Sequence, residues 1–172
     1  LQLEWMDPHG HDLGRARREL AALALRYWPD LVHLNGYREA LLPWGAPALV
    51  VAHSCVHSWW RACRGSEPDA PEWATYGAAV AAGLAAAAEW VAPSASFRDT
   101  VAALYQPPRP GLVIHNGIQA PAQMCRKQPI VLGAGRCWDE AKNLQALAAV
   151  AAELPWPVVI AGAQTSGDAG GE

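Results

Sequence analysis

The chain has 172 residues and a net charge of −3, from 13 Lys and Arg against 16 Asp and Glu. Hydrophobic residues make up 52% of it and charged residues 17%, which excludes a disordered segment. Without a basic excess no nucleic-acid partner is expected, and the length suits one domain or pieces of two.

Residues 1–117 alternate between helical and strand patterns. The predicted elements are a loop over 1–11, a helix over 12–28, a strand over 31–35, a short helix over 37–42, a strand over 48–52, a helix over 71–89, a strand over 90–92, a helix over 96–105 and a strand over 112–115. Asp12 suits an N-cap, and Pro29 ends the first helix. Residues 48–52 are a continuous apolar run, typical of a strand buried on both faces of a parallel sheet.

Residues 118–129 change in character, because they are polar, contain two prolines and lack periodicity, as in an interdomain linker. Beyond them the sequence predicts a strand over 130–132, a loop over 133–141, a helix over 142–154, a strand over 158–161 and a disordered end from 164 to 172. Residues 1–117 would then belong to one unit, and residues 130–172 would be the start of another.

Strands that alternate with helices predict an α/β fold in which helices cover a parallel sheet. The linker divides this pattern into two Rossmann-like units. Because roughly fifty residues cannot bury a complete core of this type, we expect the second domain to be truncated.

The four cysteines form no CxxC pair and predict no disulfide framework, which favours a reduced, cytoplasmic location. The sequence contains no uninterrupted apolar run of about 18 residues, so no transmembrane segment is predicted. No signal peptide is visible either.

One motif that could bind an anion is Gly133-Ala134-Gly135-Arg136, between a predicted strand and a predicted helix. Its glycines let the backbone approach an anion closely, and Arg136 and Lys142 add two cations that can bind phosphate oxygens. A plain glycine turn with two solvated cations is the alternative. The motif is neither a GxGxxG nor a GxxxxGK[ST] loop.

His53 directly follows the apolar strand over 48–52, and Asn35 and Gly36 end the strand before it. In open α/β sheets, ligands gather beyond the carboxyl ends of the strands. There His53 could donate a hydrogen bond to a sugar hydroxyl or move a proton near neutral pH. The alternatives are a surface or helix-capping histidine and a simple turn at Asn35.

Two other clusters support weaker hypotheses. His53, Cys55 and His57 match none of the usual spacings of zinc ligands, so no metal is expected. Trp59 and Trp60 are predicted to pack against the protein, and stacking on a carbohydrate is the alternative.

Six segments, taken in order, resemble retaining glycosyltransferases of family four, which have the GT-B fold. They are Asp30-Leu-Val-His-Leu-Asn35, Val50-Val-Ala-His53, Val91-Ala-Pro-Ser94, Val113-Ile-His-Asn-Gly117, Gly133-Ala-Gly-Arg136 with Lys142-Asn143, and Val159-Ile-Ala-Gly162. The resemblance covers nearly all of residues 1–163. It implies two Rossmann-like domains with the active site between them. Residues up to 117 would be the later part of the N-terminal, acceptor-side domain, and residues from about 130 would be the start of the C-terminal, donor-side domain.

The resemblance implies transfer of a sugar from a nucleotide-diphosphate sugar to a hydroxyl acceptor, with no metal and no cofactor besides that donor. Gly133, Gly135, Arg136 and Lys142 would bind the donor diphosphate. The two cations would stabilise the charge that this group acquires as the glycosidic bond breaks.

His53 would be the catalytic residue at the sugar site. The residues that would line the cleft are Asn35, Gly36, Ser54, Asn116 and Gly117. The family often has His-Asp where this chain has His53-Ser54.

The resemblance places two further features outside the sequence, namely a glycine-rich loop before Leu1 and the ribose-binding glutamates after Glu172. We therefore expect a fragment without turnover. The alternatives are a non-catalytic nucleotide-sugar-binding or scaffold protein of the same fold, and an unrelated Rossmann oxidoreductase. The oxidoreductase would need GxGxxG followed by a ribose-binding acid.

Overall fold

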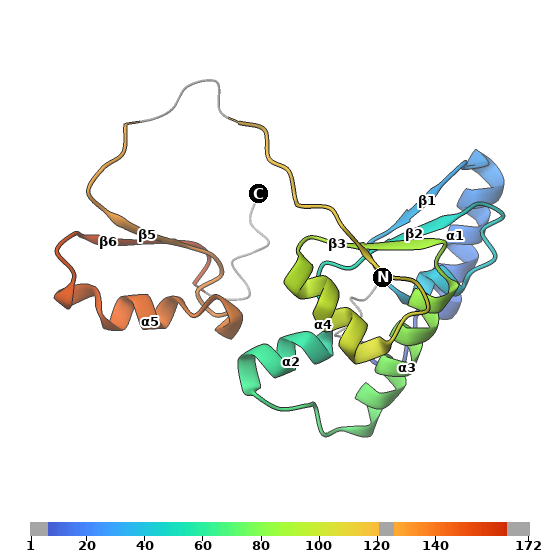
Figure 1. Ribbon diagram of the computed structural model, residues 1–172, viewed down its shortest axis with the longest axis horizontal. Helices are drawn as coiled ribbons and strands as arrows, with labels where there is room; N and C mark the ends of the chain where they lie inside the picture. Colours follow the sequence, from blue (N-terminus) through green and yellow to red (C-terminus); the bar gives the residue numbers. More distant parts are fainter. Residues whose placement is uncertain (1–6, 121–125, 165–172) are drawn as a thin grey trace. The chain divides into compact units, whose positions relative to one another are not determined.

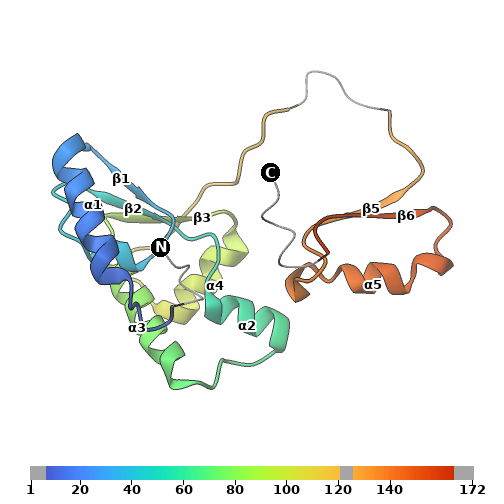
Figure 2. The same ribbon diagram turned by 180° about the vertical axis from the view of Figure 1, so that it is seen from behind.

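The computed structural model describes residues 7–120 and 126–164, so the predictions for 1–6 and 165–172 lie outside the described residues. The chain divides into two compact units, Leu1–Gly117 and Ile118–Glu172. Each unit contains a parallel sheet with helices between its strands, which confirms the predicted α/β class (Figures 1 and 2).

The first unit is built on a four-stranded parallel sheet in the order β1-β2-β3-β4. Its strands are β1 (Val32–Leu34), β2 (Ala48–Val51), β3 (Glu89–Ala92) and β4 (Leu112–Val113). Its helices are α1 (Leu13–Tyr27), the 3-10 helix η2 (Arg38–Leu41), α2 (Val56–Arg64), α3 (Pro71–Ala86) and α4 (Ala95–Tyr105). Leu34 pairs with Val50, and Val51 with Val91, so the carboxyl ends of the strands meet at one edge of the sheet.

The core of the first unit lies around β2 and β3, with α2, α3 and α4 on the same side of the sheet (Figures 1 and 2). Val50 and Ala52 are fully buried, as are Val80 of α3 and Val101 of α4. Side chains on the other face of β2 are only half-buried, because successive residues of a strand point to opposite faces. The predicted burial of β2 on both faces is therefore only partly met.

The predicted first helix is present, but its N-terminus is capped differently from the prediction. Asp12 lies at the N-cap position, and its side chain makes no capping hydrogen bond. The backbone N–H groups of His11 and Asp12 instead donate to the Asp7 carboxylate, at 2.9 and 3.2 Å. Within α1 only Ala16 is buried.

Helix α2 lies in a segment over which no helix was predicted. Cys55 is its N-cap: the Cys55 Sγ accepts from the Ser58 N–H, and the Ser58 Oγ accepts from the Cys55 N–H in return. This is a capping box in which cysteine and serine replace the usual Ser/Thr and Glu/Gln. A pattern search for the common residues therefore misses it.

The second unit contains a two-stranded parallel sheet of β5 (Val131–Ala134) and β6 (Val158–Ala161). Its helical elements are the 3-10 helix η3 (Glu140–Lys142), α5 (Leu144–Ala149) and the 3-10 helix η4 (Ala151–Glu153). The predicted continuous helix over 142–154 is wrong. Asn143 has a φ of 45°, a left-handed conformation that interrupts the helix between Lys142 and Leu144.

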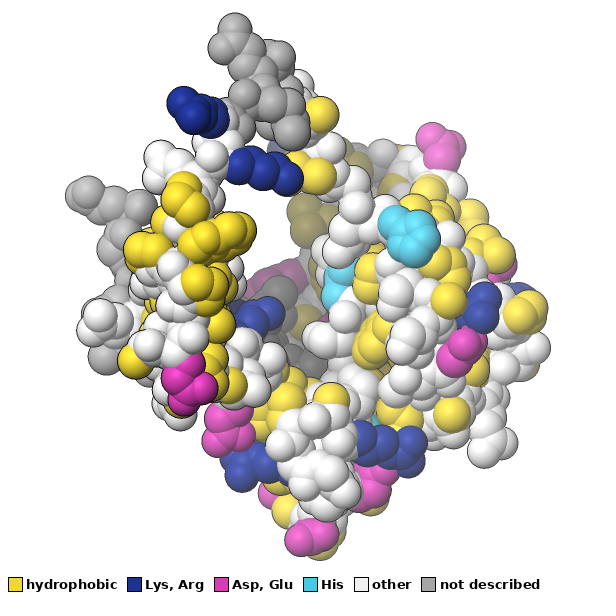
Figure 3. Space-filling model, turned by 60° about the vertical axis from the view of Figure 1, so that its left-hand side comes forward, with side chains coloured by type: hydrophobic (Ala, Val, Ile, Leu, Met, Phe, Trp, Pro, Cys, Tyr) yellow, Lys and Arg dark blue, Asp and Glu magenta, His cyan; other side chains and the backbone are white. Residues whose placement is uncertain are grey.

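Apolar side chains reach the surface of the second unit (Figure 3). Leu132 of β5 is 61% exposed and Val159 of β6 is 42% exposed, whereas Gly133 is buried under α5. Two strands with one short helix therefore bury much less apolar surface than the four-stranded first unit. In the described residues, no helix has both the length and the apolar character needed to cross a bilayer.

Candidate functional site

One candidate region, in the first unit, is the carboxyl edge of the β1–β4 sheet. Asn35 follows β1, His53 follows β2, Ser94 follows β3 and His115 follows β4. His53 thus lies at the carboxyl end of β2, an interior strand of the parallel sheet, as the sequence predicted. Because parallel strands end at the same edge, the topology brings together side chains that are far apart in the chain.

Asn35 and His53 form the one direct side-chain contact of this edge that the described residues show. The His53 Nε2 lies 3.1 Å from the Asn35 Oδ1, and both residues are exposed to solvent. Two residues predicted separately, one as a cleft-lining residue and one as a catalytic histidine, are therefore hydrogen-bonded neighbours. Their exposure leaves them accessible to a ligand.

A buried tyrosine forms a hydrogen bond with the backbone of the loop that contains His53. The Tyr37 Oη donates to the Ser54 carbonyl oxygen at 2.9 Å, and Tyr37 is only 2% exposed. The Cys55 cap of α2 fixes the same loop from its other end. Ser54 itself is exposed, so its hydroxyl can face solvent while its backbone is anchored.

A second histidine at this edge has no predicted role. The His115 Nδ1 lies 3.0 Å from the Pro93 carbonyl oxygen and links the segment after β4 to the segment after β3. His115 belongs to the segment that resembles the family, and that was its only sequence signal. The predicted cleft residues Gly36, Asn116 and Gly117 lie at the same edge: Gly36 is half-buried, and Asn116 and Gly117 are exposed.

A separate candidate region is the loop after β5, in the second unit. Gly133, predicted as part of this loop, lies within β5, where a Cβ atom would lie 2.9 Å from Leu147 and 3.0 Å from Leu144. Its small size therefore makes room for α5. The loop begins at Gly135, and a Cβ added at Gly162 would overlap the Gly135 carbonyl oxygen.

Arg136 is paired within the loop. Its Nε and Nη2 both donate to the Asp139 Oδ2, at 3.1 and 2.5 Å, and its guanidinium lies 5.2 Å from the centre of the Trp138 ring. The Asp139 side chain is only 8% exposed, and its Oδ1 accepts from the Ala141 N–H. Because a guanidinium has five N–H donors, this pairing positions Arg136 and leaves donors for an anion.

The same contacts control the ionisation of Asp139. The hydrogen bond from Arg136 holds the pKa of the Asp139 carboxyl below its usual value, against the opposing effect of burial. The Ala141 N–H and the positive charge of Lys142 act in the same direction as Arg136. Asp139 is therefore a carboxylate at neutral pH and neutralises part of the positive charge of the loop.

Lys142 lies beside Gly135, where its Cγ would be 3.2 Å from an added Cβ. It ends η3 and does not begin a helix, so the predicted helix start at this residue is wrong. With α5 only six residues long, the cations themselves are the main source of positive potential here. Both Arg136 and Lys142 are exposed.

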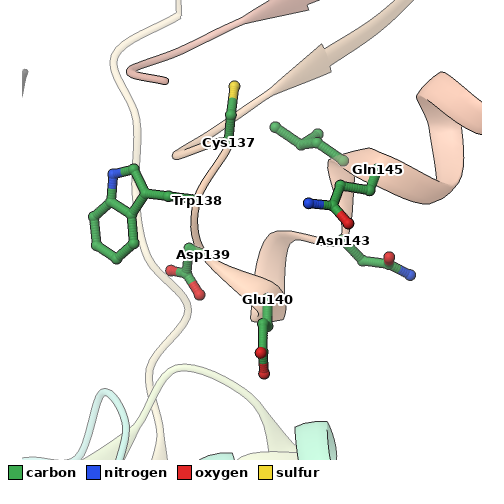
Figure 4. A pocket seen from close by; sticks show the side chains of 7 residues that line it. Cys137, Trp138, Asp139, Glu140, Asn143 and Gln145 are labelled. Carbon is green, nitrogen blue, oxygen red and sulfur yellow. The ribbon is translucent and has the colours of Figure 1, made fainter. Parts of the chain in front are cut away.

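A small pocket of about 130 Å³ opens beside this loop (Figure 4). Cys137, Trp138 and Asp139 lie along its loop side, and Asn143 and Gln145 come from the start of α5. Glu140 adds a second carboxylate, and neither predicted cation lines the pocket. The charge of the pocket therefore disfavours phosphate, and the pocket is distinct from the two exposed cations that were predicted to bind the diphosphate.

The described residues contain no group of three or more His, Cys, Asp or Glu side chains that could hold a metal ion. His57, considered as a ligand from the sequence, is 3.1 Å from the Trp73 carbonyl oxygen and stacks on Tyr105. Trp59 and Trp60 pack edge to face at 5.7 Å and are half-buried. These contacts make the cluster part of the packing between α2, α3 and α4.

The first unit is thus an α/β domain with a parallel sheet and a polar carboxyl edge, the form of many nucleotide- and sugar-binding enzymes. The family model described as Glycosyltransferase Family 4 matches residues 3–120, more than half of the chain. The chain belongs to this family, as its sequence motifs indicated, and is a glycosyltransferase by that membership. No protein with a curated description matches it.

Proposed function

We propose that this chain belongs to a retaining glycosyltransferase that has the GT-B architecture and lies in the cytoplasm. It would transfer a sugar from a nucleotide-diphosphate sugar to a hydroxyl acceptor. The observation that carries the proposal is the family match over residues 3–120, which includes the exposed Asn35–His53 pair at the carboxyl edge. That edge is where an open α/β sheet presents its ligand-binding groups.

In this proposal the two units have different tasks. His53 contacts a sugar hydroxyl at the edge of the first sheet, near Asn35, Gly36 and Ser54. Arg136 and Lys142 bind the donor diphosphate in the second unit, and the Gly135 backbone leaves room for it. The diphosphate gains negative charge as the bond to the sugar breaks, so cations that meet it there lower the barrier.

The pairing of Arg136 with Asp139 supports a binding role for the loop. A guanidinium that is already held by a buried carboxylate loses less conformational entropy when it meets a phosphate than a free one does. Asp139 therefore positions the Arg136 guanidinium and also neutralises part of its positive charge. Lys142 adds a second exposed cation beside Gly135.

A second candidate is a nucleotide-sugar-binding protein of the same fold without catalysis. The observation in its favour is Ser54, where the family often has an aspartate after the histidine. A serine hydroxyl can hydrogen-bond a ligand but carries no charge to stabilise a protonated neighbour.

The experiment titrates UDP and GDP, and then UDP- and GDP-sugars, into the purified 172-residue chain by calorimetry. Saturable binding of one nucleotide is the expected result, and lack of binding to both would contradict the proposal. Transfer and donor-hydrolysis assays with the same sugars then test for catalysis. Turnover that His53→Ala abolishes identifies an enzyme and overturns the expectation that these 172 residues lack turnover, whereas binding without turnover is the result that both candidates predict.

A further inference from the structure

The carboxyl edge of the first sheet contains two histidines whose ring nitrogens meet different kinds of partner. The His53 Nε2 faces the Asn35 side-chain oxygen at 3.1 Å, and the His115 Nδ1 faces the Pro93 carbonyl oxygen at 3.0 Å. Both histidines are exposed. In each pair the partner atom is an oxygen that carries no proton, so the hydrogen must come from the ring.

This requirement selects a different tautomer at each position. A neutral imidazole carries one N–H, so His53 bears its proton on Nε2 and His115 bears its proton on Nδ1. The nitrogens left as acceptors are the His53 Nδ1 and the His115 Nε2. Neither has a hydrogen-bond partner within residues 7–120 and 126–164.

We propose that Asn35 is a positioning residue that holds His53 in the Nε2–H tautomer, so that Nδ1 accepts a hydrogen bond from a ligand hydroxyl. The inference rests on the proposed function for its ligand. Asn35 follows β1 directly, and β1 is hydrogen-bonded to β2 in parallel register up to the Leu34–Val50 pair. The backbone of both strands therefore holds the two side chains together before any ligand binds.

The pair then offers complementary groups to a ligand. The His53 Nδ1 accepts a hydrogen bond. The Asn35 Nδ2 still offers two N–H donors, since the contact with His53 uses only the amide oxygen. A hydroxyl both donates and accepts, so one sugar hydroxyl or two neighbouring ones match this pair. A phosphate or carboxylate oxygen, which only accepts, cannot satisfy the Nδ1 lone pair. The edge therefore selects the sugar and not the diphosphate.

The test is nuclear magnetic resonance of the ¹⁵N-labelled chain, without any substrate, at a pH at which both histidines are neutral. Two-bond proton–nitrogen correlations report which ring nitrogen carries the proton, and His53→Gln and His115→Gln assign the signals. We expect His53 with a protonated Nε2 and His115 with a protonated Nδ1. A protonated Nδ1 on His53 would overturn the proposal.

Two variants of Asn35 separate positioning from simple space filling. Asn35→Leu has a similar size and no oxygen, so the two His53 nitrogen shifts should move toward each other as the tautomers mix. Asn35→Asp keeps an acceptor oxygen and should preserve the Nε2–H tautomer of the neutral ring, at a pH high enough that the added carboxylate does not keep the imidazole protonated. His115 should stay unchanged in both variants. A His53 pattern that Asn35→Leu leaves as in the wild type would contradict the role of Asn35.

The proposed function and the role of Asn35 can fail separately. If no UDP- or GDP-sugar binds, the proposed function fails while the tautomer result still stands. If sugars bind but the tautomers are not as proposed, only the role of Asn35 fails. Where transfer is measurable, Asn35→Asp should retain more of the wild-type rate than Asn35→Leu.

Discussion

Asp7 is a buried carboxylate whose contacts join the loop before α1 to η2. It is 2% exposed, its oxygens accept from the His11 and Asp12 N–H groups, and Arg38 donates to its backbone carbonyl at 2.8 Å. Burial opposes its ionisation, but the two backbone hydrogen bonds prevail and lower its pKa below the usual 3.8. Asp7 is therefore charged in the native state at neutral pH.

This lowered pKa predicts an acid-side loss of stability. The unfolded state binds a proton at Asp7 more readily than the native state does. The contribution to the free energy of unfolding is complete above the unfolded pKa of 3.8, and it is lost as the pH falls through the lower native value. Urea unfolding of the wild type and of Asp7→Asn, measured between pH 7 and pH 3, checks this.

Asp7→Asn should lower the free energy of unfolding at pH 7 by about 1 kcal/mol, the effect of one weakened hydrogen bond. It should also flatten the dependence on pH below 4. Asp69→Asn, in an exposed loop position, is the matched control and should change neither. An equally steep pH dependence in Asp7→Asn and in the wild type would refute the assignment.

At the loop after β5 the relevant quantity is the affinity for a nucleoside diphosphate. Arg136→Ala and Lys142→Ala should each weaken binding of UDP or GDP by roughly 1–3 kcal/mol, the usual range for a hydrogen bond to a charged group. Calorimetry on the purified chain measures this. Lys127→Ala removes an exposed cation outside the loop and serves as the control. Equal affinities in all four proteins would leave residues 133–136 as a plain turn.

Among the elements, α3 shows how closely two backbones approach. A Cβ atom at Gly83 would overlap the Tyr37 carbonyl oxygen, just before η2, and Gly83 itself is buried. Since the obstacle is backbone and not the end of a flexible side chain, the helix has to move to relieve the overlap. η2 precedes β2 in the chain, so this contact also supports the strand that leads to His53.

Gly83→Ala should therefore destabilise the first unit by about 1–3 kcal/mol, as overpacking in a core does. Gly14→Ala is the matched control in α1, where the atom nearest to an added Cβ is 3.9 Å away. There the gain in helix propensity should stabilise the protein by up to about 1 kcal/mol. Denaturant unfolding followed by circular dichroism separates the two, and equal midpoints would contradict the close approach.

The two units differ in how much apolar surface they bury. Val50, Ala92 and Val101 of the first unit are fully buried, whereas no strand or helix of the described second unit buries a large apolar side chain to that extent. Two-stranded sheets are marginally stable in water, and cooperative units of one chain can open at different free energies. The second unit should be the less stable of the two.

Native-state hydrogen exchange on the whole chain measures this difference. Backbone amides of β2 and β3 should exchange only through global unfolding of the first unit. Those of β5 and β6 should exchange at least tenfold faster, through opening of the second unit alone. Uniform protection in all four strands would show that the units unfold together.

Sequence alone predicted much of the fold. The apolar run over 48–52 and the alternation of strands with helices indicated the parallel α/β class. The segments around His53 and His115 indicated the family. These features depend on residues that are close in the chain, because strand propensity, proline and an N-cap such as Ser94, which accepts from the Phe97 N–H, all act locally.

Other features depended on tertiary structure, because the residues that interact are far apart in the chain or because a local tendency is overridden. The hydrogen bond between Asn35 and His53 forms because β1 lies beside β2. Position 83 requires a glycine because the segment at the start of η2 lies against α3. The left-handed Asn143 divides a segment whose composition favours a continuous helix. Local pattern thus determined most of the elements and their order, while contacts between elements decided which donors, acceptors and cations remain for a ligand.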